Sequence, residues 1–144
     1  MVIIMKEVNY KFKSNTPYSL HDMNVCKIMI NDDSITFMMK DGFEEKQEPY
    51  RIVKERIIIE KVDFDFCCIT LLSKFGEYGK FTGKKMTFQH FLMEYPDYNF
   101  EIVDELYGFN QVIYGGYLTL PNDKIIYEME INIYHFGDII YQSL

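Results

Sequence analysis

The sequence predicts a mainly β (or α+β) protein in which antiparallel sheets form a sandwich or an open barrel, with one short helix near residues 87–95. Roughly nine short segments have strand-like alternation or many β-branched residues, and turn residues separate them. Only one segment has helical spacing. The chain has no Ala and few Leu, whereas Ile, Phe and Tyr are abundant and favour pleated surfaces. A parallel α/β fold would need crossover helices, which this pattern does not provide.

The chain has the length of one domain. With 144 residues, of which 48% are hydrophobic, it can bury a core without disulfides or metals. Neither a linker nor an internal repeat divides it, and it holds only four prolines and eight glycines. We therefore expect a single globular domain over residues 1–144.

A β-hairpin is the first clear element. Residues 23–30 and 35–39 are strand-like, and Asn-Asp-Asp-Ser at 31–34 supplies the turn between them. Asp41-Gly42 then closes the second strand with typical turn residues.

The middle of the chain predicts two more strands and two loops. A polar run at 44–49 is expected to be a loop. Two β-branched stretches without Gly or Pro follow, and they predict strands at about 52–61 and 63–72. Residues 73–85 contain three glycines and four lysines, so this segment is the best candidate for a mobile loop.

One segment predicts a helix of two turns. Its apolar residues recur at i, i+3, i+4 and i+7, Thr87 can cap its N-terminus and Pro96 stops it. So short a helix must be held by packing its aromatic side chains onto a sheet.

The C-terminal third predicts strands again. The clearest alternation runs from Ile125 to Ile133, where every second residue is apolar. Gly115-Gly116 inside a strand predicts a bulge or a close approach of two backbones. The predicted strands cover residues 99–107, 111–120, 124–136 and 139–142.

Charge is distributed unevenly along the chain, whose net charge is −7. From Glu94 to the C-terminus there are nine acidic residues and one basic residue, Lys124, whereas the preceding residues hold 13 acids and 14 Lys or Arg. The same C-terminal segment contains eight of the twelve tyrosines. Tyr beside carboxylates suits the binding of a basic partner.

Neither a metal site nor a catalytic motif is present. Adjacent Cys67 and Cys68 would point to opposite faces of a strand, so with Cys26 they are expected to be small buried hydrophobic residues in a reducing compartment. No two histidines have metal-ligand spacing, and His135 is expected to be partly buried and hydrogen-bonded. We therefore predict no cofactor, no metal and no catalytic residues.

The sequence gives little support to binding of nucleotides or nucleic acids, or to secretion or membrane insertion. The lysines at 73–85 lack the spacing of a P-loop, and the acidic net charge opposes nucleic-acid binding. The apolar N-terminal run is too short for a signal peptide, and no stretch is long enough to span a membrane. Together with the cysteine usage, this predicts a cytoplasmic protein.

Five residues form the candidate binding site for a protein partner. Glu128 and Glu130 share one face of a strand about 7 Å apart, and Tyr134 lies on that face too. Asp104 and Glu105 are expected on a neighbouring strand.

Three functional hypotheses follow. The first is a non-enzymatic module whose acidic, Tyr-bearing sheet face docks on a basic protein. The second is a small-ligand carrier, with a pocket inside a curved sheet gated by residues 73–85. The third is a hydrolase, which requires Glu128, Glu130 and a histidine to converge in one cleft. Exposed edge strands also make a homodimer an open alternative.

Two short segments resemble elements of small uncharacterised all-β proteins from A+T-rich bacteria. They are Tyr18-Ser19-Leu20-His21-Asp22 and Glu105-Leu106-Tyr107-Gly108-Phe109-Asn110. Some such families are immunity proteins that neutralise toxins. The resemblance implies an acidic cytoplasmic inhibitor that covers the active site of a basic toxin, and it assigns no functional residues.

Overall fold

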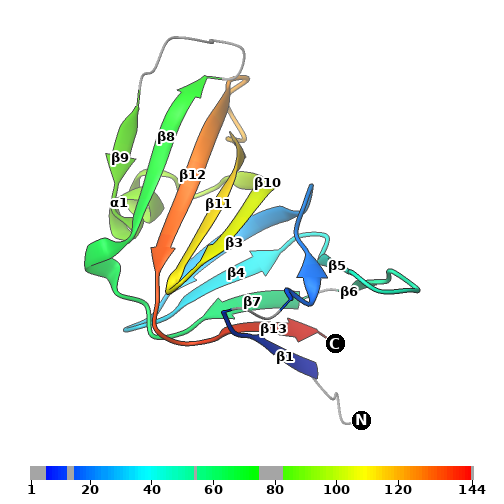
Figure 1. Ribbon diagram of the computed structural model, residues 1–144. Coiled ribbons are helices and arrows are strands. Elements are labelled where there is room, and N and C mark those ends of the chain that lie inside the picture. The colour runs from blue at the N-terminus through cyan, green and yellow to red at the C-terminus, as the bar shows by residue number, and fades with distance from the viewer. Residues whose placement is uncertain (1–5, 13–14, 54, 75–82, 144) are drawn as a thin grey trace, which may run out of the picture.

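The computed structural model describes residues 6–12, 15–53, 55–74 and 83–143, and it confirms a mostly antiparallel β fold with one short α-helix. Ten strands form one continuous antiparallel sheet, in the order β1-β13-β7-β4-β3-β10-β11-β12-β8-β9 (Figure 1). Three short strands, β2, β5 and β6, form a second sheet. The strands are β1 (Lys6–Tyr10), β2 (Tyr18–Ser19), β3 (Asn24–Ile30), β4 (Ile35–Met39), β5 (Phe43–Glu45), β6 (Ile52–Val53), β7 (Glu55–Ile59), β8 (Cys68–Lys74), β9 (Lys84–Met86), β10 (Asn99–Gly108), β11 (Gln111–Thr119), β12 (Ile126–Tyr134) and β13 (Ile139–Ser143).

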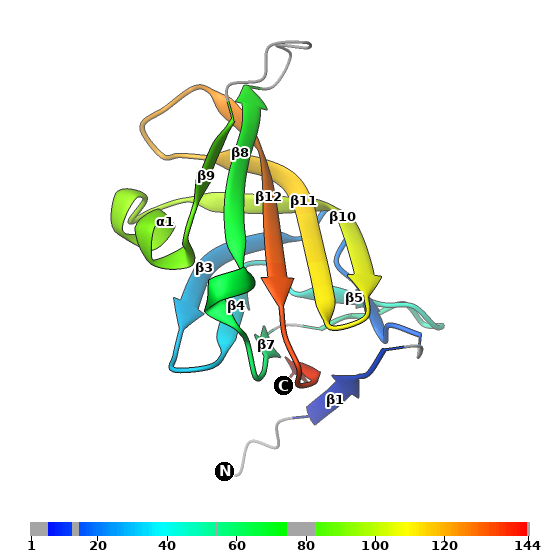
Figure 2. The same cartoon turned by 60° about the vertical axis from the view of Figure 1, so that its left-hand side comes forward.

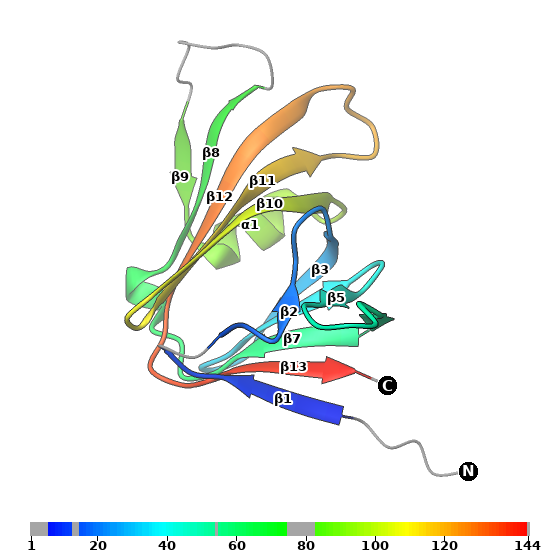
Figure 3. The same cartoon turned by 45° about the vertical axis from the view of Figure 1, so that its right-hand side comes forward.

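The large sheet bends sharply, so that its two halves face each other as two layers (Figure 3). One layer contains β1, β13, β7, β4 and β3, and the other contains β10, β11, β12, β8 and β9. The strands β3 and β10 join the layers through the pairs Phe100↔Val25 and Glu101↔Asn24. This arrangement fits the predicted sandwich or open sheet.

A corner joins the layers a second time, where the chain leaves β7 for β8 and leaves β12 for β13. Val62 and His135 form an isolated antiparallel bridge there, and Asp63 N donates to Tyr134 O at 2.9 Å. A Cβ on Gly137 would lie 2.8 Å from Glu60 O, so only glycine fits this crossing.

The core fills the space between the layers with aliphatic and aromatic side chains. Its largest fully buried members come from both layers and include Phe37, Phe100, Tyr114 and Tyr141. Phe37 and Tyr114 meet edge to face with ring centroids 5.4 Å apart, a favoured geometry for buried aromatic pairs.

The small sheet covers one open end of this core. Tyr18 of β2 packs on Phe43 of β5 with ring centroids 4.6 Å apart, and it also contacts Tyr141 at 5.4 Å. Leu20, directly after β2, is fully buried. The strands β2 and β5 are therefore held mainly by the side chains that they insert into the larger core.

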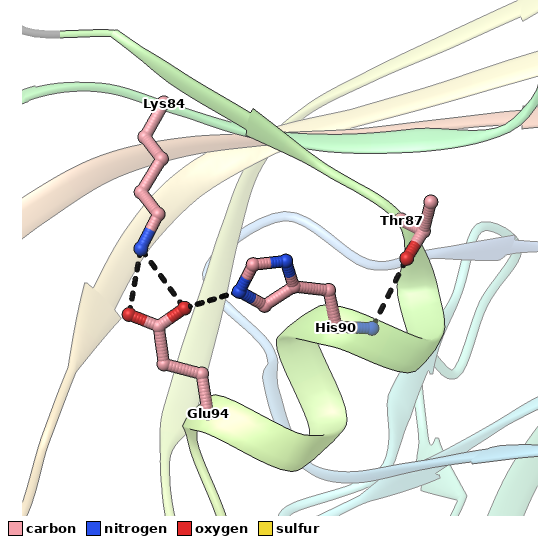
Figure 4. A network of polar contacts seen from close by, with 4 residues as sticks. All are labelled: Lys84, Thr87, His90 and Glu94. Carbon is pink, nitrogen blue, oxygen red and sulfur yellow. Dashed lines mark hydrogen bonds and ion pairs between the residues drawn. The ribbon is translucent and has the colours of Figure 1, made fainter.

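The predicted helix is present as α1 (Phe88–Glu94), with Phe88 and Phe91 buried. Thr87 caps it, because its hydroxyl accepts a hydrogen bond of 3.1 Å from His90 N. Glu94 links the helix to the edge strand β9 through an ion pair of 2.6 Å with Lys84 (Figure 4). It also pairs with His90 of the same helix at 2.8 Å.

Several sequence predictions were correct. The hairpin of β3 and β4 pairs from Val25↔Met39 to Ile30↔Ile35. His135 is buried, and its Nδ1 lies 2.8 Å from Gly137 O.

Other sequence predictions were wrong in detail. The strand expected from residue 63 begins only at Cys68, because Asp63 caps a 3₁₀ helix, η1 (Phe64–Phe66), by accepting from Asp65 N. Part of the loop expected at 44–49 belongs to β5. Cys26 is exposed, whereas Cys67 is buried as expected. Residues 75–82, most of the expected mobile loop, lie outside the described part of the chain.

Candidate functional site

The candidate site lies on the outer face, by which we mean the surface of β10, β11, β12 and β8 that points away from the other layer. Figure 2 shows these four strands side by side. Their inward residues, such as Ile102, Leu118 and Met129, are buried, and the residues between them are at least partly exposed.

A β-bulge decides which carboxylates reach this face. The register of β10 on β11 shifts between Ile102 and Asp104, so that Val103 is an extra residue. In a regular strand Ile102 and Asp104 would point the same way. With the bulge, Ile102 is buried and Asp104 is exposed on the outer face.

Two cross-strand rows then bring the carboxylates together. In the first row, Asp104 of β10 pairs with Gly115 of β11, and Gly115 pairs with Glu130 of β12. In the second row, Glu101 pairs with Tyr117, and Tyr117 pairs with Glu128. The sequence had suggested that the strands of Asp104 and Glu130 are neighbours. This prediction was wrong, because β11 lies between β10 and β12.

Because a glycine stands at the centre of the first row, the row has a gap. Asp104, Glu128 and Glu130 line a hollow of about 220 Å³, together with Gly115, Gly116 and Tyr117. We call this the acidic hollow. Tyr117 also borders a second hollow of about 280 Å³, lined by Glu101, Thr119 and Ile126 among others.

The two glycines have different roles. A Cβ on Gly116 would overlap the carbonyl oxygen of Glu101, so the close packing of β11 on the bulge requires glycine there. A Cβ on Gly115 would make ordinary contact with Asp104 Cβ at 3.7 Å. Gly115 therefore keeps the hollow open, although the backbone at this position would also accept a residue with a side chain.

Within the described residues, no ion pair joins the outer-face carboxylates of Glu101, Asp104, Glu128 or Glu130 to a cation. Glu128 accepts a hydrogen bond of 2.9 Å from Ser73 Oγ, which orients it without neutralising it. The described residues also contain no group of acidic, His and Cys side chains that could hold a metal ion.

Tyr134 lies on the same face as Glu128 and Glu130, at the end of β12. Its ring contacts Phe66 at 5.8 Å and Phe136 at 5.3 Å between centroids. The strand rise places it about 13 Å from Glu130 along β12, so it belongs to the outer face but not to the acidic hollow.

Glu105, the fifth predicted residue, points to the opposite face of β10. Its Oε1 accepts from Tyr107 Oη at 2.7 Å, and its Oε2 accepts from Leu20 N at 3.1 Å. Burial raises the pKa of the Tyr107 hydroxyl far above its usual range, so that hydroxyl stays protonated and donates. Glu105 is thus a structural residue in this arrangement.

The histidines contact other groups. His21 Nδ1 lies 3.0 Å from Asp22, His90 contacts Glu94, and His135 contacts Gly137. The described residues that line the acidic hollow include no histidine. The convergence that the hydrolase hypothesis required is therefore not seen around Glu128 and Glu130.

The carrier hypothesis also gains no support from the described residues. Leu20, Phe37, Tyr114 and Tyr141 are fully buried in the interior, where a ligand would have to lie. Within the described part of the chain, no helix has the length and apolarity needed to cross a membrane.

None of the family models, curated proteins or solved structures compared with this chain matches it. The fold and the site together define a mainly antiparallel β protein in which acidic side chains gather on the outer face of one layer.

Proposed function

We propose that this chain is a non-enzymatic protein-binding module that docks its outer face on a basic surface of a partner protein. The observation that carries the proposal is the convergence of Asp104, Glu128 and Glu130 around one hollow, where none of the three forms an ion pair with a cation of the described residues.

Electrostatics favours a cationic partner. Carboxylates that form no ion pair among the described residues repel one another, and a Lys or Arg of a partner would relieve that repulsion while forming charge-assisted hydrogen bonds. Tyr117, between the two hollows, adds ring surface that can be buried at low entropic cost. Such a surface would also speed the encounter with a basic protein.

Within this class, an immunity-type inhibitor of a basic toxin is the more specific form of the proposal. The resemblance of the segments at 18–22 and 105–110 implied such a role. An acidic face is the kind of surface that could cover the basic active site of a nuclease. A toxin gene beside the gene for this chain would support the specific form.

The test is a capture experiment in extracts of the cells that make this protein. The bait is the wild-type chain or the triple variant Asp104→Asn, Glu128→Gln, Glu130→Gln, at low and high salt. A matched control is Asp41→Asn, Glu48→Gln, Asp97→Asn, which removes the same charge from exposed positions outside the outer face.

We expect the wild type and the control to retain a basic protein at low salt and to lose it at high salt. The outer-face variant should lose it at both. The captured protein is then identified and its affinity for the three chains is measured with purified components. The proposal would be refuted if no basic protein is captured. It would also be refuted if the amount of captured protein depends neither on salt nor on the outer-face charges.

A further inference from the structure

An exposed aromatic cluster lies at the end of the outer face, where β12 meets η1. It consists of Phe66, Tyr134 and Phe136, whose rings make the two contacts of 5.8 and 5.3 Å described above. Phe66 is 69% exposed and Phe136 is 59% exposed. Figure 2 shows η1, the short helix before β8, beside the tip of β12. Phe66 is tilted at 54° to the half-buried ring of Tyr134, and Phe136 meets that ring edge to face. Adjacent rings that stay open to solvent, as those of Phe66 and Phe136 do, are typical of binding surfaces.

Carboxylates adjoin this cluster. Phe136 also lines a hollow of about 440 Å³ whose other described walls include Asp32, Asp63 and Asp65. Among the described residues of that lining, the one cation is Lys61. Among the described residues, no ion pair neutralises any of the three aspartates. The aromatic cluster is therefore bordered by net negative charge.

We propose that the aromatic cluster is a second contact point of the docking face and receives an arginine side chain of the partner. This inference rests on the proposed function. A guanidinium group is planar, weakly hydrated and cationic, so it can stack on exposed rings while its N–H groups face carboxylates. An apolar side chain could pack on the rings, but it would remove water from the aspartates without forming an ion pair with them. The more strongly hydrated ammonium of lysine stacks less well.

The two contact points define a spacing for the partner. Glu130, at the edge of the acidic hollow, and Tyr134 are four residues apart on one strand, which corresponds to about 13 Å. Two basic side chains four residues apart on an extended segment have the same separation. The partner is therefore expected to present a basic residue for the acidic hollow and an arginine for the aromatic cluster at this distance.

Short synthetic peptides test the inference without the natural partner. The probe is a Gly/Ser peptide with two arginines four residues apart, and comparison peptides replace one arginine with leucine or lysine. Binding to the full chain is followed by NMR shift changes at Glu130, Tyr134 and Phe136. The aromatic variant Phe66→Leu, Phe136→Leu keeps apolar side chains but removes the ring faces, and Phe109→Leu is the control at another exposed Phe.

We expect the diarginine peptide to bind best and to bind the aromatic variant about fivefold more weakly, as loss of a cation–π contact implies. The Phe109→Leu control should bind like the wild type. Equal binding of the leucine peptide, no effect of the aromatic variant, or no saturable binding of the diarginine peptide would each overturn the inference.

The failure of this inference can be told apart from failure of the proposed function. If the triple variant Asp104→Asn, Glu128→Gln, Glu130→Gln weakens peptide binding but the aromatic variant does not, only the arginine site is wrong. If neither variant changes binding, the acidic docking face is refuted as well.

Discussion

The Tyr107 hydroxyl donates a hydrogen bond of 2.7 Å to Oε1 of Glu105, two residues earlier on the same strand. The other carboxylate oxygen accepts from Leu20 N, at the start of the segment that follows β2. One carboxylate therefore links the inner side of β10 to the chain that covers the open end of the core. The backbone joins the same segment to β10 as well, because Asp22 N donates to Ile102 O at 2.7 Å and Ile102 N donates to Met23 O at 2.9 Å.

The first prediction concerns Tyr107→Phe. Since the lost hydrogen bond has a charged acceptor in a partly buried site, the free energy of unfolding should fall by about 2 kcal/mol. Urea denaturation measures the change. Tyr127→Phe is the control, because its hydroxyl bonds Asp123 at 3.2 Å in a more exposed site and should cost less. Equal losses in the two variants would contradict a special role for the Glu105 link.

The second prediction concerns the neighbouring Tyr114. Its hydroxyl is fully buried and has no hydrogen-bond partner among the described residues. Burial raises the pKa of this hydroxyl well above its usual value, so it remains neutral. Tyr114→Phe should therefore leave stability unchanged or raise it by about 1 kcal/mol, measured by urea denaturation. A loss larger than that seen for Tyr107→Phe would show that the hydroxyl is bonded in solution.

The sequence predicted those elements of the fold whose signal lies within a short segment of the chain. The alternation in β12, the hairpin of β3 and β4, and the Thr87 cap of α1 each lie within a short segment, and all were predicted. The 3₁₀ turn at Phe64–Phe66 was missed, because alternating Asp and Phe fits a strand as well as a turn capped by Asp63. β1 was also missed, since a five-residue edge strand has too little pattern to identify.

The candidate site was predicted only in part, for a physical reason. Glu128, Glu130 and Tyr134 share a face because β12 is regular there. Asp104 and Glu105 could not be assigned to faces, because the bulge at Val103 shifts the alternation of β10. The sequence suggested a bulge or a close approach at Gly115-Gly116, and Gly116 does approach the backbone of Glu101 closely, whereas the bulge lies on the opposite strand β10. The gap that Gly115 leaves between Asp104 and Glu130 depends on strand order, which local patterns do not reveal.

The third prediction concerns the Lys84–Glu94–His90 network, which lies on the surface. The hydrogen bond from Lys84, followed by that from His90, lowers the pKa of Glu94, and Glu94 raises the pKa of Lys84. A lowered carboxyl pKa stabilises the fold above the unfolded-state pKa, and this contribution disappears as the pH falls through the folded-state value. The Lys84 contribution disappears instead as the pH rises through its raised pKa.

Glu94→Gln should therefore lower Tm slightly at neutral pH, and the difference from the wild type should vanish in acid. Thermal unfolding by circular dichroism across the acidic range measures this. Because the groups are exposed, added salt should shrink the effect. A difference that persists below the pKa of Glu94 would mean that the substitution acts on helix packing and not through charge.

The last prediction uses the two adjacent glycines of β11. Gly116→Ala should cost about 3 kcal/mol of stability or prevent folding, because the added methyl meets the backbone of Glu101, which cannot move without breaking the bulge. Gly115→Ala should fold normally, because its methyl makes only ordinary contact with Asp104.

Gly115→Val should also fold, since β-branched residues suit strands, yet it would fill the acidic hollow while keeping every charge. Urea denaturation separates Gly116→Ala from the other two, and binding of a basic partner should then fall from Gly115→Ala to Gly115→Val. If Gly115→Val binds like the wild type, the carboxylates act by long-range attraction alone and the hollow receives no side chain.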